Sequence, residues 1–403
     1  MSAHERLQTH RQGHTLDRGS ALRRESADLI ATSVQAMLAN QQANGAFIAS
    51  PDFHQYHYCW LRDASFVAYA LDRVGEVEAS ARYHDWVVMA IEGMAPVMDA
   101  AVRRQRAGLP LDRAEMSPAR FSLGGLAVPD DWPNFQMDGY GIWLWSLHEH
   151  LAAAGSERLS DRLAPTVERM ARYVASFALS PCFDVWEEDG LSVHTSTLAC
   201  VYGGLIAAAS MLDDAEIAAR AEEVQGFVHA LGRRQGRFEK SSASRQVDAS
   251  LLWLSQPFGL VGPSDPAFVQ TVSEVAEKLE FEGGLRRYPS DTYYGGGVWP
   301  LLNASLGWHY ASVGDLTTAR YHLEWIAEHF DEEGHLAEQF GGERRDPVMY
   351  REWEARWGPP ARELLWSHAM FVVLADTVAR AAGGIGGDEE PNDLQLGTYE
   401  RST

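Results

Sequence analysis

The chain has 403 residues, of which 34 are Lys or Arg and 56 are Asp or Glu, so its formal net charge is −22. Such an acidic surface repels phosphate backbones and anionic lipid headgroups, which argues against a nucleic-acid partner and against a membrane surface. Hydrophobic residues make up 46% and charged residues 22%, so the composition is that of an ordinary folded globular chain rather than a disordered one.

The sequence shows none of the usual signs of export or of a bound metal. Three cysteines, Cys59, Cys182 and Cys200, are too few for a disulfide framework and lack the paired spacing of a zinc site. The first residues contain no apolar signal region, and no run of about 18 apolar residues predicts a membrane-spanning helix. There is no HExxH, GxSxG or Walker motif. We therefore expect a cytoplasmic protein with no cofactor and no metal.

Amphipathic stretches rich in Ala and Leu dominate the chain and strand signals are scarce, which predicts an all-α fold. Short turns containing Gly or Asp join the two members of each helix pair, as in an αα-hairpin. Longer segments rich in Gly, Pro and aromatic residues join one pair to the next. In chain order, helices are expected at 20–41, 62–73, 76–100, 135–154, 159–177, 195–212, 214–232, 247–254, 266–280, 300–313, 315–330 and 362–381.

The long connections precede every second helix and contain the unusual residues of the sequence. Six hairpins at a repeat of roughly 60 residues predict a closed ring of helix pairs, with the even helices inside. The N-terminal ends of the inner helices then meet at one mouth, where six long loops surround a single pocket. The alternative is an irregular all-α protein whose loops do not converge. We expect one barrel domain at 19–382 between flexible segments at 1–18 and 383–403.

Two loop segments carry carboxylates suited to acid–base chemistry. Trp186 stands beside Glu187 and Glu188, and an indole face raises the pKa of a neighbouring carboxyl group, which suits a general acid at neutral pH. Glu338, followed by Gln339, lies in a second loop. Taken alone, each segment is also typical of an exposed acidic turn.

The segment from Tyr56 to Asp63 combines aromatic rings with an Arg–Asp pair. Arg62 and Asp63, side by side at a helix start, can hold two neighbouring sugar hydroxyls, one as donor and one as acceptor. The alternative is a surface ion pair over a buried aromatic cluster. The same residue types recur at 132–138 and 287–299, and with 13 Trp and 14 Tyr the composition favours a neutral polyhydroxylated ligand.

The run His148-Glu149-His150 lies inside an expected helix. Residues two apart on a helix point to different sides, so these histidines are not a metal-binding pair. We expect them on the solvated surface.

Taken in order, the motifs resemble those of the glucoamylase family of glycoside hydrolases, family 15, over about residues 56–370. The matching positions are Tyr56, Trp60, Arg62 and Asp63 for YxxxWxRD, Trp132, Gln136 and Asp138 for WxxxQxD, Trp186, Glu187 and Glu188 for WEE, Arg287 to Trp299 for RYPxDxYYGGxxW, Glu338 and Gln339 for EQ, and Trp366 and Ser367 for WS.

This resemblance implies an (α/α)6 barrel and an inverting hydrolase of α-glucosidic bonds. It implies Glu187 as general acid and Glu338 as general base, with Tyr56 and Gln339 orienting the base and its water. The substrate-binding residues that it implies are Tyr56, Trp60, Arg62, Asp63, Trp132, Trp186, Glu188, Arg287, Tyr293, Gln339 and Trp366.

The resemblance also assigns the two ends of the pocket. Arg62 and Asp63 are expected to hold the far hydroxyls of the non-reducing glucose. Trp132, Glu188 and Arg287 are expected to line the leaving-group side.

The departures from the family pattern narrow the expected substrate. The trehalase-like branch tends to replace the second Glu of WEE, whereas Glu188 and Asp189 stand here, which disfavours trehalose. We expect the barrel to occupy most of the chain, without the β-sandwich or starch-binding modules of larger relatives. We therefore expect a monomeric bacterial enzyme, closest in architecture to single-domain isomaltose glucohydrolases. Its expected partners are short neutral gluco-oligosaccharides, with α-1,6 linkage first, α-1,4 second and trehalose third. The competing class is a non-catalytic sugar-binding barrel.

Overall fold

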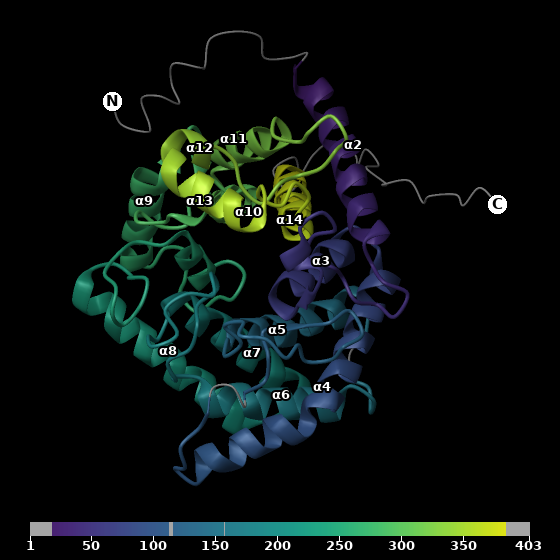
Figure 1. Ribbon diagram of the computed structural model, residues 1–403, viewed down its shortest axis with the longest axis vertical. Coiled ribbons are helices and arrows are strands. Elements are labelled where there is room, and N and C mark those ends of the chain that lie inside the picture. Colours follow the sequence, from purple (N-terminus) through teal and green to yellow (C-terminus); the bar gives the residue numbers. More distant parts are fainter. Residues whose placement is uncertain (1–17, 113–115, 157, 384–403) are drawn as a thin grey trace, which may run out of the picture.

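The inside of the structure is a closed circle of six helical elements (Figure 1). The computed structural model describes residues 18–112, 116–156 and 158–383. Each inner element packs on the next in chain order, and the last packs on the first. They are α3 (Leu61–Arg73), α5 (Asp138–Ala153), α7 (Thr195–Leu212), the 3-10 helix η3 (Ala249–Leu254), α10 (Pro300–Ser312) and α14 (Leu365–Gly383).

Six further helices form an outer layer packed on the inner elements, and α4, α6 and α11 each contact two of them. Helix α2 (Arg18–Ala39) packs on α14, α4 (Val77–Arg106) on α3 and α5, and α6 (Ala164–Phe177) on α5 and α7. Helix α8 (Ala215–Gln235) packs on α7, α9 (Pro266–Leu279) on η3, and α11 (Leu316–Ala327) on α10 and α14. The expected all-α fold, an (α/α)6 barrel, is confirmed.

The inner helices are apolar on most sides because the ring buries them on most sides. In the described part of the chain, α7 is the single helix long and apolar enough to span a membrane, with a mean hydropathy of 1.5. Its contacts with α5, α8 and η3 bury 67% of it inside the barrel, as in a core helix. The backbones of α5 and α7 touch at Gly141 and Gly204. A Cβ on Gly204 would lie 2.4 Å from the Gly141 carbonyl oxygen, so this crossing requires glycine.

The twelve expected helices all have counterparts, although the one expected at 247–254 is the 3-10 helix η3. Two α-helices in the described part of the chain were not expected, α12 (Gly342–Arg345) and α13 (Pro347–Trp357), both between α11 and α14. The flexible segments expected at 1–18 and 383–403 lie outside the described residues, apart from Arg18 in α2 and Gly383 in α14.

Short elements complete the pocket end of the barrel. The 3-10 helix η1 (His54–Tyr56) leads into strand β1 (Cys59–Trp60), which pairs antiparallel with β2 (Arg120–Phe121). Strand β3 (Glu280–Phe281) pairs antiparallel with β4 (Gly284–Leu285). The 3-10 helix η4 (Tyr293–Gly295) precedes α10.

One surface assignment from the sequence is wrong. His150 is buried in the barrel wall near the end of α5, where its Nδ1 lies 3.0 Å from Asp72 Oδ1 of α3. Its neighbours His148 and Glu149 are at the surface, with side chains 41% and 39% exposed. The helix turns by about 100° per residue, so adjacent positions face different surroundings.

Candidate active site

A cavity of about 380 Å³ lies where the inner helices begin. Ligand pockets in proteins usually measure roughly 300–1,000 Å³, so this one is at the small end of the range. All of the expected site residues except Gln339 line it. These are Tyr56, Trp60, Arg62, Asp63, Trp132, Trp186, Glu187, Glu188, Arg287, Tyr293, Glu338 and Trp366.

Glu338 is buried in this pocket, with 1% of its surface exposed. Tyr56 donates its hydroxyl hydrogen to Glu338 Oε1 at 2.6 Å, whereas Oε2 has no hydrogen-bond partner among the described residues. Burial raises the pKa of this carboxyl group to about 7, although the Tyr56 hydroxyl, Arg287 and the Gln339 amide each act to lower it. A carboxylate with one oxygen held and the other without a hydrogen-bond partner is suited to accept a proton near neutral pH.

Glu187 lies in the same cavity with its backbone in the left-handed region, at φ 67°. Its Oε1 accepts hydrogen bonds from Trp60 Nε1 at 2.7 Å and from Gln136 Nε2 at 3.1 Å. Both of these hydrogen bonds go to one oxygen, so Oε2 is the atom placed to carry and donate a proton. A non-glycine residue in this conformation is strained by about 1–2 kcal/mol, which is typical of functional positions.

The loop that carries Glu187 is held by Asp184. The Asp184 side chain accepts the backbone N–H groups of Trp186 at 3.0 Å and Glu188 at 2.9 Å. Lys240 lies 3.1 Å from Asp184 Oδ2 and 2.8 Å from Asp248 Oδ2, which in turn accepts the indole N–H of Trp186. The Trp186 indole is therefore anchored to the scaffold through Asp248, and it is Trp60 that contacts the Glu187 carboxyl group.

One segment, from η1 to β1, positions both catalytic candidates. Tyr56 donates a hydrogen bond to Glu338. Trp60, which comes four residues later, donates one to Glu187. The two rings contact each other edge to face at 5.6 Å. The hydroxyl of Tyr56 also lies 3.0 Å from that of Tyr293, which fixes its direction. The separation of the two carboxyl groups therefore depends on this short segment.

Arg62 and Asp63 are the buried floor of the pocket, with 6% and 8% of their surfaces exposed. Two hydrogen bonds fix the guanidinium group of Arg62: it donates to Gln136 Oε1 at 3.0 Å and to Asp138 Oδ2 at 2.9 Å. Its Nε lies 3.2 Å from Asp63 Oδ2. Burial raises the pKa of Asp63 to about 6, although Arg62 acts in the opposite direction.

Arg287 and Glu188 form a charged pair at another part of the pocket wall. Arg287 donates to Asp291 Oδ2 at 2.8 Å and to Glu188 Oε1 at 3.2 Å. Tyr288 donates its hydroxyl hydrogen to the other oxygen of Glu188. Glu188 is 38% exposed, so it borders the open side of the pocket.

Trp132 reaches the pocket from the loop before α5. The guanidinium group of Arg120 lies 3.7 Å from the centre of its ring and is paired with Asp130, whose Oδ1 accepts the Trp132 backbone N–H at 3.1 Å. Arg120 was not expected from the sequence, because its role depends on the distant pairing of β1 with β2.

Gln339 does not line this cavity of about 380 Å³. Its Oε1 accepts the backbone N–H of Gly297 at 3.1 Å, and the residue borders a separate cavity of about 850 Å³ behind the loop. Its amide acts on the pKa of Glu338. Its expected contact with the attacking water stays a prediction.

Helix α13 adds three pocket residues that sequence reasoning missed. Trp353, Arg356 and Trp357 line the cavity, and the ring of Trp353 lies 5.0 Å from that of Tyr293. The signal that could have found them is the spacing of Trp353 and Trp357, four residues apart and therefore on one face of a helix.

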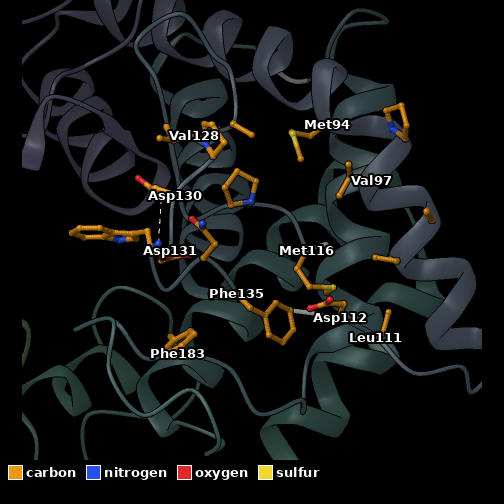
Figure 2. Close-up of a pocket in the computed structure, with 18 of the residues that line it drawn as sticks. Met94, Val97, Leu111, Asp112, Met116, Val128, Asp130, Asp131, Phe135 and Phe183 are labelled. Carbon is orange, nitrogen blue, oxygen red and sulfur yellow. Dashed lines mark hydrogen bonds between the residues drawn. The ribbon is translucent and has the colours of Figure 1, made fainter. Parts of the chain in front are cut away.

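A larger cavity of about 970 Å³ adjoins the pocket and shares Asp131 and Trp132 with it. Figure 2 shows Met94 and Val97 of α4 across from Val128. Most of this lining is apolar, whereas the catalytic candidates are in the smaller cavity. We therefore assign the chemistry to the smaller one.

The smaller cavity also gathers buried polar atoms that have no hydrogen-bond partner in the described part of the chain. Buried polar groups are normally satisfied, so their convergence indicates a ligand rich in donors and acceptors. The atoms are Glu338 Oε2 and the indole Nε1 atoms of Trp132, Trp299, Trp353 and Trp366.

An (α/α)6 barrel with two carboxyl groups in a small pocket, surrounded by indole rings and unsatisfied polar atoms, has the features of a glycoside hydrolase. The family model described as "Glycosyl hydrolases family 15" matches residues 25–376, and the chain belongs to that family. The isomaltose glucohydrolase of Kribbella flavida is 39% identical, covering 84% of this chain and 89% of its own length.

Solved structures agree with this assignment. A glycosidase variant in complex with glucose has a TM-score of 0.85 and 37% identity, covering 91% of this chain and 99% of that one. A bacterial glucoamylase complexed with acarbose shares the fold, with a TM-score of 0.65 and 18% identity, covering 88% of this chain and 55% of that one.

Proposed function

We propose that the protein is an exo-acting, inverting α-glucoside hydrolase that releases β-D-glucose from the non-reducing end of short gluco-oligosaccharides. Linkages of the α-1,6 isomaltose type are favoured. The observation that carries the proposal is the presence of Glu187 and Glu338 in one small pocket with unsatisfied polar atoms around them.

Glu187 acts as the general acid. Trp60 and Gln136 hold its Oε1, so a proton on Oε2 is transferred to the glycosidic oxygen as the bond from that oxygen to the anomeric carbon breaks. The leaving sugar departs as a neutral alcohol. The developing positive charge on the anomeric carbon and its ring oxygen is met by the carboxylates of the pocket.

Glu338 acts as the general base. Its Oε2, which has no hydrogen-bond partner among the described residues, takes a proton from a water molecule, and the water oxygen forms the new bond to the anomeric carbon from the opposite face. Attack on that face converts an α-glucoside into β-glucose. The hydrogen bond from Tyr56 to Oε1 stabilises the ionised form that the base needs.

Arg62 and Asp63 bind the far hydroxyls of the non-reducing glucose. The guanidinium group is fixed by Gln136 and Asp138, so its Nε and the Asp63 carboxylate form a preset donor–acceptor pair. This pair closes the pocket beyond one sugar unit, which makes cleavage terminal. The preference for α-1,6 linkages is supported by the similarity to the Kribbella isomaltose glucohydrolase.

The test is to follow the anomer released from isomaltose, maltose, trehalose and longer chains by proton NMR at early times. We expect β-glucose to appear first and isomaltose to give the highest kcat/KM. Initial α-glucose would require a retaining mechanism. A higher kcat/KM on maltose or on trehalose would assign the α-1,4 or trehalase alternative, and binding without turnover would indicate a sugar-binding protein.

A further inference from the structure

A cluster of three buried side chains lies at the other end of the barrel wall from the sugar pocket. Asp72 is in the last turn of α3, His84 is in the outer helix α4, and His150 is near the end of α5. The sugar-binding Asp63 stands at the start of α3, nine residues earlier, and the helix rise of about 1.5 Å per residue separates it from Asp72 by roughly 14 Å. The cluster is therefore independent of the active site.

The three side chains are arranged like metal ligands. One ligand atom from each lies within 4.8 Å of the others, and all three residues are buried. The rings of His84 and His150 are 4.8 Å apart between centroids. Ligands around a four-coordinate zinc ion lie about 2.0–2.2 Å from it, so small side-chain adjustments would bring these atoms into range.

His84 provides an independent indication of a ligand. It is 2% exposed, and neither of its ring nitrogens has a hydrogen-bond partner in the described part of the chain. An unsatisfied buried imidazole is costly and calls for an explanation such as an ion or an ordered water.

The carboxylate of the cluster is already oriented. Ser80 donates its hydroxyl hydrogen to Asp72 Oδ2 at 2.8 Å, and Asp72 Oδ1 faces His150 Nδ1 at 3.0 Å. A hydrogen bond that orients a ligating carboxylate, as the one from Ser80 orients Asp72, is typical of metal sites. Two imidazoles and one carboxylate form a ligand set that suits zinc, with water or another oxygen as fourth ligand.

We propose that Asp72, His84 and His150 form a structural binding site for a divalent transition metal, preferentially Zn²⁺, that links α3, α4 and α5. A metal at this point would join two neighbouring inner helices to an outer one. It would stabilise the fold without taking part in sugar hydrolysis.

The test uses the full-length protein stripped with EDTA and titrated with Zn²⁺ alone or Co²⁺ alone. We expect one tight Zn²⁺ per chain, a visible d–d spectrum of low-symmetry Co²⁺, and a rise in Tm of at least about 2 °C with saturating Zn²⁺. His84→Gln and His150→Gln should abolish the binding and the Tm shift while leaving kcat on isomaltose unchanged. Ser80→Ala, a milder change, should weaken binding by about 10-fold or more.

His335→Gln is the matched control. His335 belongs to the surface group Asp331, Glu333 and His335, in which both acids are exposed and which is the other candidate cluster in the described residues. This variant should keep both the metal and the Tm shift. The proposal is overturned if the wild-type protein binds no Zn²⁺, if His335→Gln removes it, or if a folded His84→Gln protein retains it. Ser80→Ala and the Co²⁺ spectrum of the wild type decide the case if His84→Gln does not fold.

Discussion

At the scale of single residues, the two catalytic candidates differ in what surrounds them. Glu187 meets two N–H donors on one oxygen, whereas Glu338 is more deeply buried and has a single short hydrogen bond from Tyr56. The difference is suited to a division of labour in which one group gives a proton and the other takes one. Neither environment is visible in the local sequence, because the donors come from other segments.

Removing either carboxylate should leave the fold intact and lower kcat. We expect Glu187→Gln and Glu338→Gln to lose about 10²–10⁴-fold in kcat on isomaltose. Azide should partly rescue Glu338→Ala, because it can attack where the activated water does. Glu343→Gln, an exposed carboxylate five residues after Glu338, is the control and should be unchanged. A variant at 187 or 338 that keeps near wild-type activity would require the roles to be reassigned.

The hydrogen bond from Tyr56 should set the acidic limit of activity. Glu338 must be ionised to act as base, and its pKa is about 7, so kcat/KM should fall as the pH drops through that value. The Tyr56 hydroxyl lowers this pKa, so Tyr56→Phe should raise it and move the acidic limb to higher pH. The measurement is the pH profile of kcat/KM, with Tyr350→Phe as control. A limb that stays in place or moves to lower pH would contradict the assignment.

At the scale of elements, the regular helices were predictable and the irregular pocket wall was not. The αα-hairpins follow from amphipathic periods ended by turn residues, as at Asp214, whose side chain caps α8 by accepting the N–H of Ile217 at 3.1 Å. Helix α13 was missed because it lies outside the six predicted hairpins and none of its residues is buried, which leaves the spacing of Trp353 and Trp357 as its one helical signal. The roles of Arg120 and Lys240 depend on partners that the fold brings from elsewhere in the chain.

Helix α13 should contribute to recognition of the leaving sugar. Trp353 lines the pocket and packs against Tyr293, so Trp353→Ala should lower kcat/KM on isomaltose by about 10-fold. The same change should have little effect on α-glucosyl fluoride, which has no leaving sugar to bind. Arg351→Ala, at an exposed position of the same helix, is the control. An equal loss on both substrates would show that Trp353 supports the catalytic carboxylates instead.

At the scale of the whole molecule, the residues of the pocket and the helix contacts that close the barrel lie in different parts of the fold. The loops before the inner helices bring the pocket residues together at one end, and the helix contacts close the circle behind them. A net charge of −22 on the surface does not oppose entry of an uncharged substrate. The fixed scaffold and the small pocket together determine which substrates can be cleaved.

The size of the pocket should limit the useful length of the substrate. Arg62 and Asp63 form its buried floor, and the cavity of about 380 Å³ leaves little room beyond a terminal glucose and the start of the next unit. Remote sugar units then add little to transition-state stabilisation. We expect kcat/KM to peak at the disaccharide or trisaccharide and not to rise with chain length.

The same reasoning predicts that Asp63→Ala sharply lowers kcat/KM, because hydroxyls of the bound glucose would lose their acceptor and Arg62 would lose its ion pair. The loss in kcat/KM should be similar for isomaltose and for longer chains, since every substrate places a glucose on this floor. The kcat/KM values of the wild-type enzyme and of Asp63→Ala are measured as initial glucose release from an α-1,6 oligomer series. A steady rise in kcat/KM up to dextran would instead indicate several leaving-group subsites, for which the adjoining cavity beside Trp132 is the available space.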